Sequence, residues 1–102
     1  MSQMNIELMN GHPVGGVNSE AHVFNIDDRP IGHITNDGHV FDVNDRPLGE
    51  VKDDGHVFDH EMHPVGEVHS DGHVFDHEMH PVGRVAPPHV MFGGAALLLL
   101  FR

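Results

Sequence analysis

The sequence lacks cysteine, and it has only 5 lysines and arginines against 16 aspartates and glutamates. Without cysteine there is no disulfide framework, no thiolate metal site and no thiol nucleophile. The net charge of −11 with neutral histidine disfavours nucleic acid and anionic lipid, because both are negatively charged. The only long apolar run, residues 95–101, is far shorter than the ~20 residues that a membrane-spanning helix needs. We therefore expect no nucleic-acid partner and no transmembrane segment.

The start of the chain, MSQMNIELMN, lacks the basic and apolar regions of a signal peptide, so the default expectation is a cytoplasmic protein. A mass of 11.3 kDa corresponds to one domain, which buries roughly 60–70% of the surface that its unfolded chain exposes. We expect residues 1–102 to form this single domain.

Repetition is the most informative feature of the chain. Proline recurs every seventeen residues, at Pro13, Pro30, Pro47, Pro64 and Pro81. The repeats cover residues 13–29, 30–46, 47–63, 64–80 and 81–102, and a further strand is expected at residues 5–8. A period this short predicts a small unit that buries its apolar side only against its own copies.

Each repeat has the pattern of a β-hairpin, in which two β-rich runs flank a turn. In three repeats the turn carries an Asp-Gly pair, at Asp37-Gly38, Asp54-Gly55 and Asp71-Gly72. A two-residue type I′ turn at Asp54-Gly55 places Val51 opposite Phe58, Lys52 opposite Val57 and Glu50 opposite Asp59. The equivalent core pairs are Val17 with Phe24, Ile34 with Phe41, Val68 with Phe75, and Val85 with Met91. The glycine two residues after each proline predicts a β-bulge or a close approach of neighbouring backbones.

The two ends of the chain allow three ways to complete the fold. The all-β interpretation has five tandem hairpins closed about a pseudo-five-fold axis, with residues 97–101 as an apolar C-terminal strand that threads the middle. Alternatively, that strand pairs with residues 5–8 and closes a sixth hairpin. The third option is an open β-solenoid, which leaves the leucine run exposed. No helix is expected.

The tandem hairpins with the pattern DGxVxDxxxxxxG are followed by a linker at residues 86–88 and by an apolar segment after Gly93-Gly94-Ala95-Ala96. In these features the chain, from Gly11 onward, resembles the small bacterial proteins called 5-fold β-flower proteins. The resemblance implies a compact wheel of hairpins, and it implies no activity.

Twelve histidines are the candidate ligands for chemistry. One position of the repeat, just after the turn, predicts a ring of imidazoles: His22, His39, His56, His73 and His89. A second group lies in two DHEMH segments, where His60, His63, His77 and His80 are candidate ligands for zinc, nickel or copper, with His12 and His69 as neighbours. The simpler interpretation is that the histidines flank exposed turns and were copied with the repeat.

Facing acidic residues form a further candidate site. The assumed register sets Glu50 opposite Asp59 and Glu67 opposite Asp76, and such pairs repel unless solvent or a hard cation such as calcium lies between them. The second repeat relieves this repulsion by setting His33 opposite Asp42. The simpler interpretation is a hydrated acidic face that keeps the molecules apart.

Catalysis is not expected, because interchangeable repeats do not give the different environments that an acid and a base need. The first hypothesis is a non-catalytic structural or protein-interaction module, with an unknown protein partner or self-association through its apolar end. The alternative is a histidine-rich protein that binds divalent metal or responds to pH, because histidine titrates between about pH 5 and 8. A subunit of a larger extracellular or viral assembly is a third option.

Overall fold

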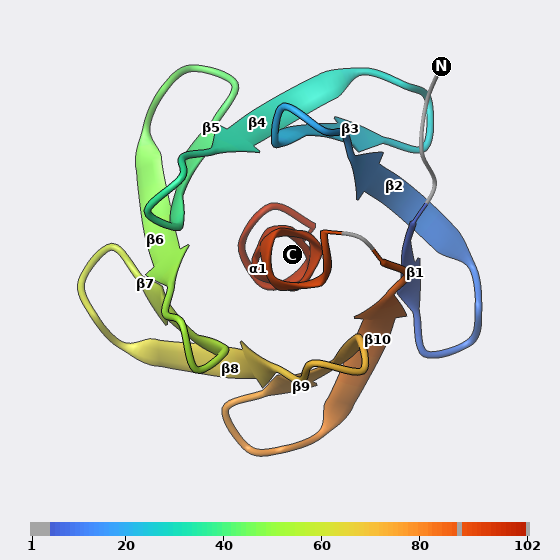
Figure 1. Ribbon diagram of the computed structural model, residues 1–102, viewed down its shortest axis with the longest axis vertical. Coiled ribbons are helices and arrows are strands. Elements are labelled where there is room, and N and C mark those ends of the chain that lie inside the picture. Colours follow the sequence, from blue (N-terminus) through green and yellow to red (C-terminus); the bar gives the residue numbers. More distant parts are fainter. Residues whose placement is uncertain (1–4, 88, 102) are drawn as a thin grey trace.

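The computed structural model describes residues 5–87 and 89–101, so residues 1–4, 88 and 102 of the expected domain and linker lie outside the described part. It contains ten strands around one central helix (Figure 1). The elements are β1 (Ile6–Leu8), β2 (Pro13–Val17), β3 (His22–Asn25), β4 (Pro30–Ile34), β5 (His39–Asp42), β6 (Pro47–Val51), β7 (His56–Asp59), β8 (Pro64–Val68), β9 (His73–Asp76), β10 (Pro81–Val85) and α1 (Val90–Leu99).

The strands form a closed antiparallel barrel in which each strand pairs with its neighbours in sequence and β10 returns to β1. Ile6 of β1 pairs with Val85 of β10, so the two ends of the chain together supply the fifth strand pair. The barrel is therefore consistent with five-hairpin closure rather than with a sixth hairpin or an open solenoid. The predicted pair of Val85 with Met91 is wrong, because Met91 lies in α1.

The predicted register within each hairpin is wrong by one residue, because the turn has three residues rather than two. The backbone N–H of Gly55 donates to the carbonyl of Lys52, and the N–H of Lys52 donates to the carbonyl of His56. Gly55 has a φ of 94°, so it supplies the left-handed residue that follows a type I turn in a three-residue hairpin loop. As a result Val51 pairs with Val57.

The inner face of the barrel is lined by valine and isoleucine, and the phenylalanines predicted as their core partners lie half-buried on the outer face. The observed cross-strand pairs are Val17 with Val23, Ile34 with Val40, Val51 with Val57, Val68 with Val74, and Ile6 with Val85. The displaced partners are Phe24, Phe41, Phe58 and Phe75. The Asp-Gly tips were located correctly, but the length of their loop decides which side chains face inward.

The predicted C-terminal strand is instead the helix α1, which occupies the centre of the barrel (Figure 1). Residues 93–99 are all buried, so this part of the helix has no solvent-facing side. A lone strand at this place would leave its backbone N–H and C=O groups unpaired, whereas a helix pairs them within itself. The prediction that the leucine run fills the middle is confirmed in this form. Within residues 5–87 and 89–101, no helix has the length and apolar character needed to cross a membrane.

The strand glycines make room for the central helix, as the predicted close approach requires. A Cβ at Gly66 would lie 2.2 Å from the carbonyl oxygen of Phe75 and 2.9 Å from Cδ1 of Leu98. The pairing between β7 and β8 shifts beside this glycine, so the predicted bulge is present too. Five consecutive residues contact the five glycines in turn: Leu97 at Gly83, Leu98 at Gly66, Leu99 at Gly49, Leu100 at Gly32, and Phe101 at Gly15.

Candidate functional site

Four of the five histidines predicted to form a ring open alternate strands of the barrel: His22, His39, His56 and His73. Their side chains are exposed, and each precedes a buried valine, so they lie on the outer face. We call these four histidines and the residues paired with them the outer belt. His89 is not in the belt, because it occupies the N-cap position of α1.

Each of the four belt histidines lies within 4.0 Å of a carboxylate of the turn that precedes it. The Nδ1 atoms of His39 and His56 each lie 3.0 Å from the side chain of Asp37 and Asp54, respectively. Thr35 donates its hydroxyl to Asp37, and this bond together with His39 lowers the pKa of Asp37 to about 2. The bond to Asp37 raises the pKa of His39 in return. These contacts hold each imidazole against its own turn.

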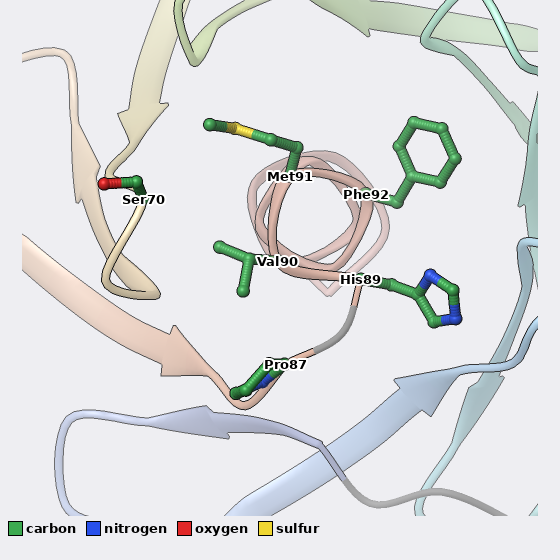
Figure 2. Close-up of a pocket in the computed structure, with 6 residues that line it drawn as sticks. All are labelled: Ser70, Pro87, His89, Val90, Met91 and Phe92. Atoms are coloured by element: carbon green, nitrogen blue, oxygen red, sulfur yellow. The ribbon is translucent and has the colours of Figure 1, made fainter.

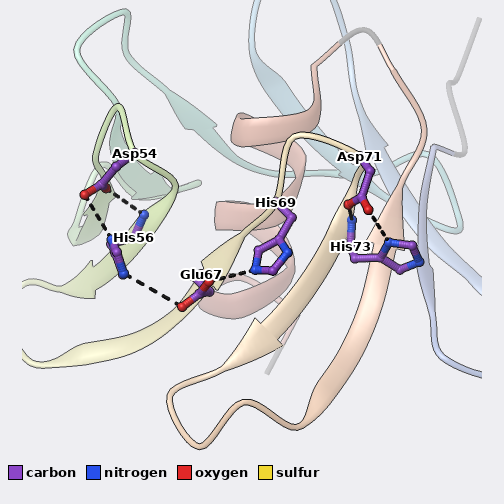
Figure 3. Close-up of polar contacts among 6 residues, drawn as sticks. All are labelled: Asp54, His56, Glu67, His69, Asp71 and His73. Atoms are coloured by element: carbon purple, nitrogen blue, oxygen red, sulfur yellow. Dashed lines mark hydrogen bonds and ion pairs between the residues drawn. The ribbon is translucent and has the colours of Figure 1, made fainter.

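Glu67 connects two histidines of neighbouring hairpins (Figure 3). Its Oε2 lies 2.7 Å from Nε2 of His69, and its Oε1 lies 3.8 Å from Nε2 of His56. The other ring nitrogen of His56 contacts Asp54, whose pKa is lowered chiefly by the backbone N–H of His56 and then by the imidazole. The imidazole of His69 also packs on Phe75, with ring centroids 4.7 Å apart. The result is one continuous polar chain across β7 and β8.

The same place in the other repeats is chemically different. Glu50 lies 3.8 Å from Nε2 of His39 but 2.9 Å from the ammonium group of Lys52, which replaces the second imidazole. Arg84 stands at the place of Glu67 one repeat later, and its Nε lies 2.6 Å from Oε1 of Glu7. The belt therefore combines one backbone pattern with several side-chain sets.

The facing acidic pairs predicted from the sequence do not exist. Glu50 pairs with Phe58 and Glu67 with Phe75, while Asp59 and Asp76 pair with glycines. His33, predicted opposite Asp42, pairs with Phe41 and stacks on its ring at 5.2 Å. The argument for a hard cation between facing carboxylates loses its basis with the one-residue shift.

Turns at the periphery of the wheel connect each hairpin to the next (Figure 1). We call them the outer turns, and they comprise residues 9–12, 26–29, 43–46, 60–63 and 77–80. The two DHEMH segments form the last two of them. In one of them donor atoms of Asp59, Glu61 and His63 lie within 4.8 Å of one another, and Asp76, Glu78 and His80 repeat this arrangement. His60 and His77, also predicted as ligands, are exposed and are not part of these groups. His12 lies in the first outer turn, where its backbone N–H donates to Asn10.

A pocket of about 500 Å³ opens at the end of the barrel where α1 begins. We call it the helix pocket; it is lined by Ser70, Pro87, His89, Val90, Met91 and Phe92. Figure 2 shows Val90, Met91 and Phe92 spreading from the first turn of α1 toward different parts of the wall. This pocket was not predicted from the sequence, because residues 89–92 were expected in a strand pair.

The link that Glu67 makes between His56 and His69 was not predicted from the sequence either. The signal was present in the alternation of the strand, since residues two apart share a face and a neighbouring strand brings the third group beside them. The one-residue register error concealed it.

Comparison with known proteins gives a family but no activity. No curated protein and no solved structure matches the chain. The family model described as "4-fold beta flower protein" matches residues 9–91, which is most of the chain. The fold number in that description differs from the five-fold resemblance expected from the sequence, although the type of protein is the same. The chain belongs to the 4-fold beta flower protein family.

Proposed function

We propose that this protein is a non-catalytic interaction module that binds a basic partner at the helix pocket. The interior of the barrel is filled by α1, whose residues 93–99 are buried. The described part of the molecule thus presents its outer surfaces, rather than a central chamber, to other molecules. The observation that carries the proposal is the apolar pocket at one end of a strongly acidic protein.

The helix pocket has an apolar centre. Val90, Met91 and Phe92 are only partly buried, although each packs against the core on one side. Contiguous apolar surface with a polar surround is typical of protein-binding sites, and side chains at the centre of such a patch contribute most of the binding energy. Met91 and Phe92 are therefore the expected anchors.

Carboxylates occupy the turns at the same end of the barrel. Gly55 lies in one of these turns, and a Cβ added to it would lie 3.7 Å from the methyl group of Met91. These turns are therefore at the same end of the barrel as the helix pocket. The acidic side chains of these turns are Glu20, Asp37, Asp53, Asp54 and Asp71. A partner that carries lysine or arginine around an apolar anchor complements this surface, and opposite charge also speeds its association. Self-association is opposed at neutral pH by the net charge of −11.

Two synthetic peptides test the proposal by calorimetric titration. They share a Leu-Phe centre, which is flanked by lysine and arginine in one and by glutamate in the other. The basic peptide is expected to bind, more weakly as salt rises, and Met91→Ser is expected to weaken it about tenfold, which corresponds to 1.4 kcal/mol.

Met9→Ser is the matched control, because Met9 is an exposed methionine in an outer turn. It is expected to leave peptide affinity unchanged. Equal binding of the two peptides contradicts the proposal, as does a Met91→Ser protein that melts normally and binds the basic peptide as before. Sedimentation showing a dimer that Met91→Ser dissociates identifies a second copy of the chain as the occupant instead.

A second candidate function is binding of divalent metal or a response to pH through the histidines. The observation that favours it is the number of imidazoles beside carboxylates: eight lie within 4.0 Å of one, namely His22, His33, His39, His56, His63, His69, His73 and His80. Histidine is the side chain type whose charge changes between about pH 5 and 8, so acidification cancels negative charge on the protein. Light scattering between pH 7 and pH 5, with and without a chelator, tests whether assembly depends on pH and on bound metal.

A further inference from the structure

The end of the barrel opposite the helix pocket, where the outer turns lie, is apolar at its centre. Leu100 and Phe101 follow α1 there; they are partly buried and lie beside Gly32 and Gly15, respectively. The residue before each of the five strand glycines is also aliphatic, partly buried and packed against the core. These residues are Val14, Ile31, Leu48, Val65 and Val82. We call them, together with Leu100 and Phe101, the apolar mouth.

The outer turns around the mouth add further apolar surface. Within residues 5–87 and 89–101, every large apolar side chain that is exposed belongs to an outer turn or directly precedes one. These side chains are Leu8, Met9, Ile26, Val43, Met62 and Met79. The turns at the helix-pocket end contain none of them. Apolar surface that gathers at one end of a molecule is typical of a protein-binding site.

Charges of both signs lie on the outer turns, and they are distributed unevenly around the wheel (Figure 1). Counted along the chain, the second and third outer turns end in Arg29 and Arg46. The fourth and fifth carry Glu61 and Glu78, each between two histidines. The first, residues 9–12, has no lysine, arginine or carboxylate. One side of the rim therefore carries the arginines, and the other side carries glutamate and histidine.

The two arginines of the rim are available to another molecule. Among the ion pairs of the part of the chain that the structure describes, Lys52 and Arg84 each contact a glutamate, and none includes Arg29 or Arg46. Both arginine side chains are exposed. Two cations without an internal partner thus lie beside an apolar centre.

We propose that two copies of the chain form a symmetric dimer in which their apolar mouths face each other. A two-fold axis, the commonest symmetry of protein dimers, sets the same patch on both sides of the interface. When this axis passes through the first outer turn, the second turn of one copy meets the fifth of the other, and the third meets the fourth. Arg29 then faces Glu78 of the second copy, and Arg46 faces Glu61, which gives four pairs of opposite charge. The aspartates of the second and third turns face the histidines of the fifth and fourth turns.

The order of the charges favours this axis over the other four of a five-membered wheel. An axis through the second turn sets Arg29 against its own copy and Glu61 against Glu78, and an axis through the third sets Arg46 against its own copy. Axes through the fourth or fifth turn set a glutamate against its own copy. Like charges that meet across an interface oppose association. Only the axis through the first turn avoids every such contact between these four residues.

The size of the surface and the net charge are compatible with this dimer. The wheel measures 33 × 30 Å across, so one face covers roughly 800 Å², about the area that each partner contributes to a stable interface. The net charge of −11 opposes association in general. However, the acidic turns around the helix pocket lie at the two far ends of the dimer, away from the interface. Both helix pockets stay open, so this inference is independent of the peptide binding proposed above.

Sedimentation velocity of the untagged protein at pH 7, over a range of concentrations, tests the inference. The unmodified protein is expected to dimerise. Arg29→Glu with Arg46→Glu is expected to weaken the dimer about tenfold or more, because glutamate then faces glutamate. Glu61→Arg with Glu78→Arg is expected to do the same, because arginine then faces arginine. An equal mixture of the two double variants is expected to dimerise, since every pair across the interface again has opposite charges.

Arg29→Lys with Arg46→Lys is the matched control; it keeps both charges and is expected to keep the dimer. Leu48→Ser places a hydroxyl in the apolar mouth and is expected to weaken the dimer about tenfold, with urea unfolding to show that the variant is folded. An unmodified protein that stays monomeric overturns the inference. Double variants that dimerise alone, or that do not dimerise when mixed, also overturn it. A dimer that Met91→Ser dissociates and the charge variants do not lies at the helix pocket, which contradicts the proposed interface.

Discussion

The inner wall of the barrel and the outer belt differ in how much the repeats vary. On the inner wall every repeat contributes a valine or isoleucine and a glycine, and each glycine contacts one residue of the 97–101 segment. On the outer face one position of the same strands is occupied by Gly16, His33, Glu50, Glu67 and Arg84. The repeats are alike where all five meet a single helix, and they differ where each meets only its neighbour and solvent.

This difference indicates where function is to be sought. A substitution on the inner wall changes the fit of a shared central helix, so identical residues there are explained by packing. The outer position has no such constraint, because its side chain contacts only neighbouring strands, turns and solvent. The change from Lys52 to His69 beside an equivalent glutamate is therefore chemically informative in a way that the valines are not.

Truncation of the central helix is expected to have the largest effect. Leu98→Ala removes a side chain that is 7% exposed and contacts Gly66, and the cavity should lower the free energy of unfolding by about 2–4 kcal/mol. Urea unfolding measures the loss. Leu8→Ala is the control, because Leu8 is 36% exposed, and it should cost about 0.5 kcal/mol or less. Equal losses in the two variants contradict the central role of α1.

Much of this architecture could be predicted from the sequence. The seventeen-residue period, the strand at residues 5–8 and the positions of the Asp-Gly tips follow from local chemistry, and the structure confirms them. The glycine after each proline correctly indicated a close approach of groups. These features depend on residues near each other in the chain.

Two features could not be predicted because they depend on the closed barrel. Residues 97–101 read as a strand when their leucines are considered alone. Residues 90–99 form a helix instead, because a surrounding wall covers every side of residues 93–99. The loop length depends on Gly55 following a type I turn rather than forming part of a two-residue turn. That single difference moved Glu67 from a place opposite Asp76 to a place beside His56 and His69, so this contact could not be predicted without the correct register.

The outer turns are expected to respond with an intermediate gain in stability. Met62 has a φ of 68°, a left-handed conformation that costs a residue with a Cβ about 1 kcal/mol or more. Met62→Gly should therefore raise the free energy of unfolding by about 0.5–1 kcal/mol after allowance for the freer unfolded chain. Met9→Gly is the matched control, since Met9 is also exposed in an outer turn but has no positive φ. If both variants are equally stable, backbone strain is not what distinguishes the turn.

The outer belt should show the smallest effect, because its charges are exposed and screened by solvent. Asp37 has its pKa lowered to about 2 from 3.8, so its contribution is present above about pH 4 and is lost as the pH falls through about 2. In Asp37→Asn this contribution is absent, and the difference in urea midpoint from the unmodified protein should shrink as the pH falls from 4 to 2.

The same variant should lower the raised pKa of His39, measured by NMR titration of its imidazole. Asp53→Asn removes one charge from the next turn without this contact and should shift His39 much less. A His39 titration that is unchanged in Asp37→Asn shows that the pair is not coupled, and the belt histidines would then be independent of the turns that carry them.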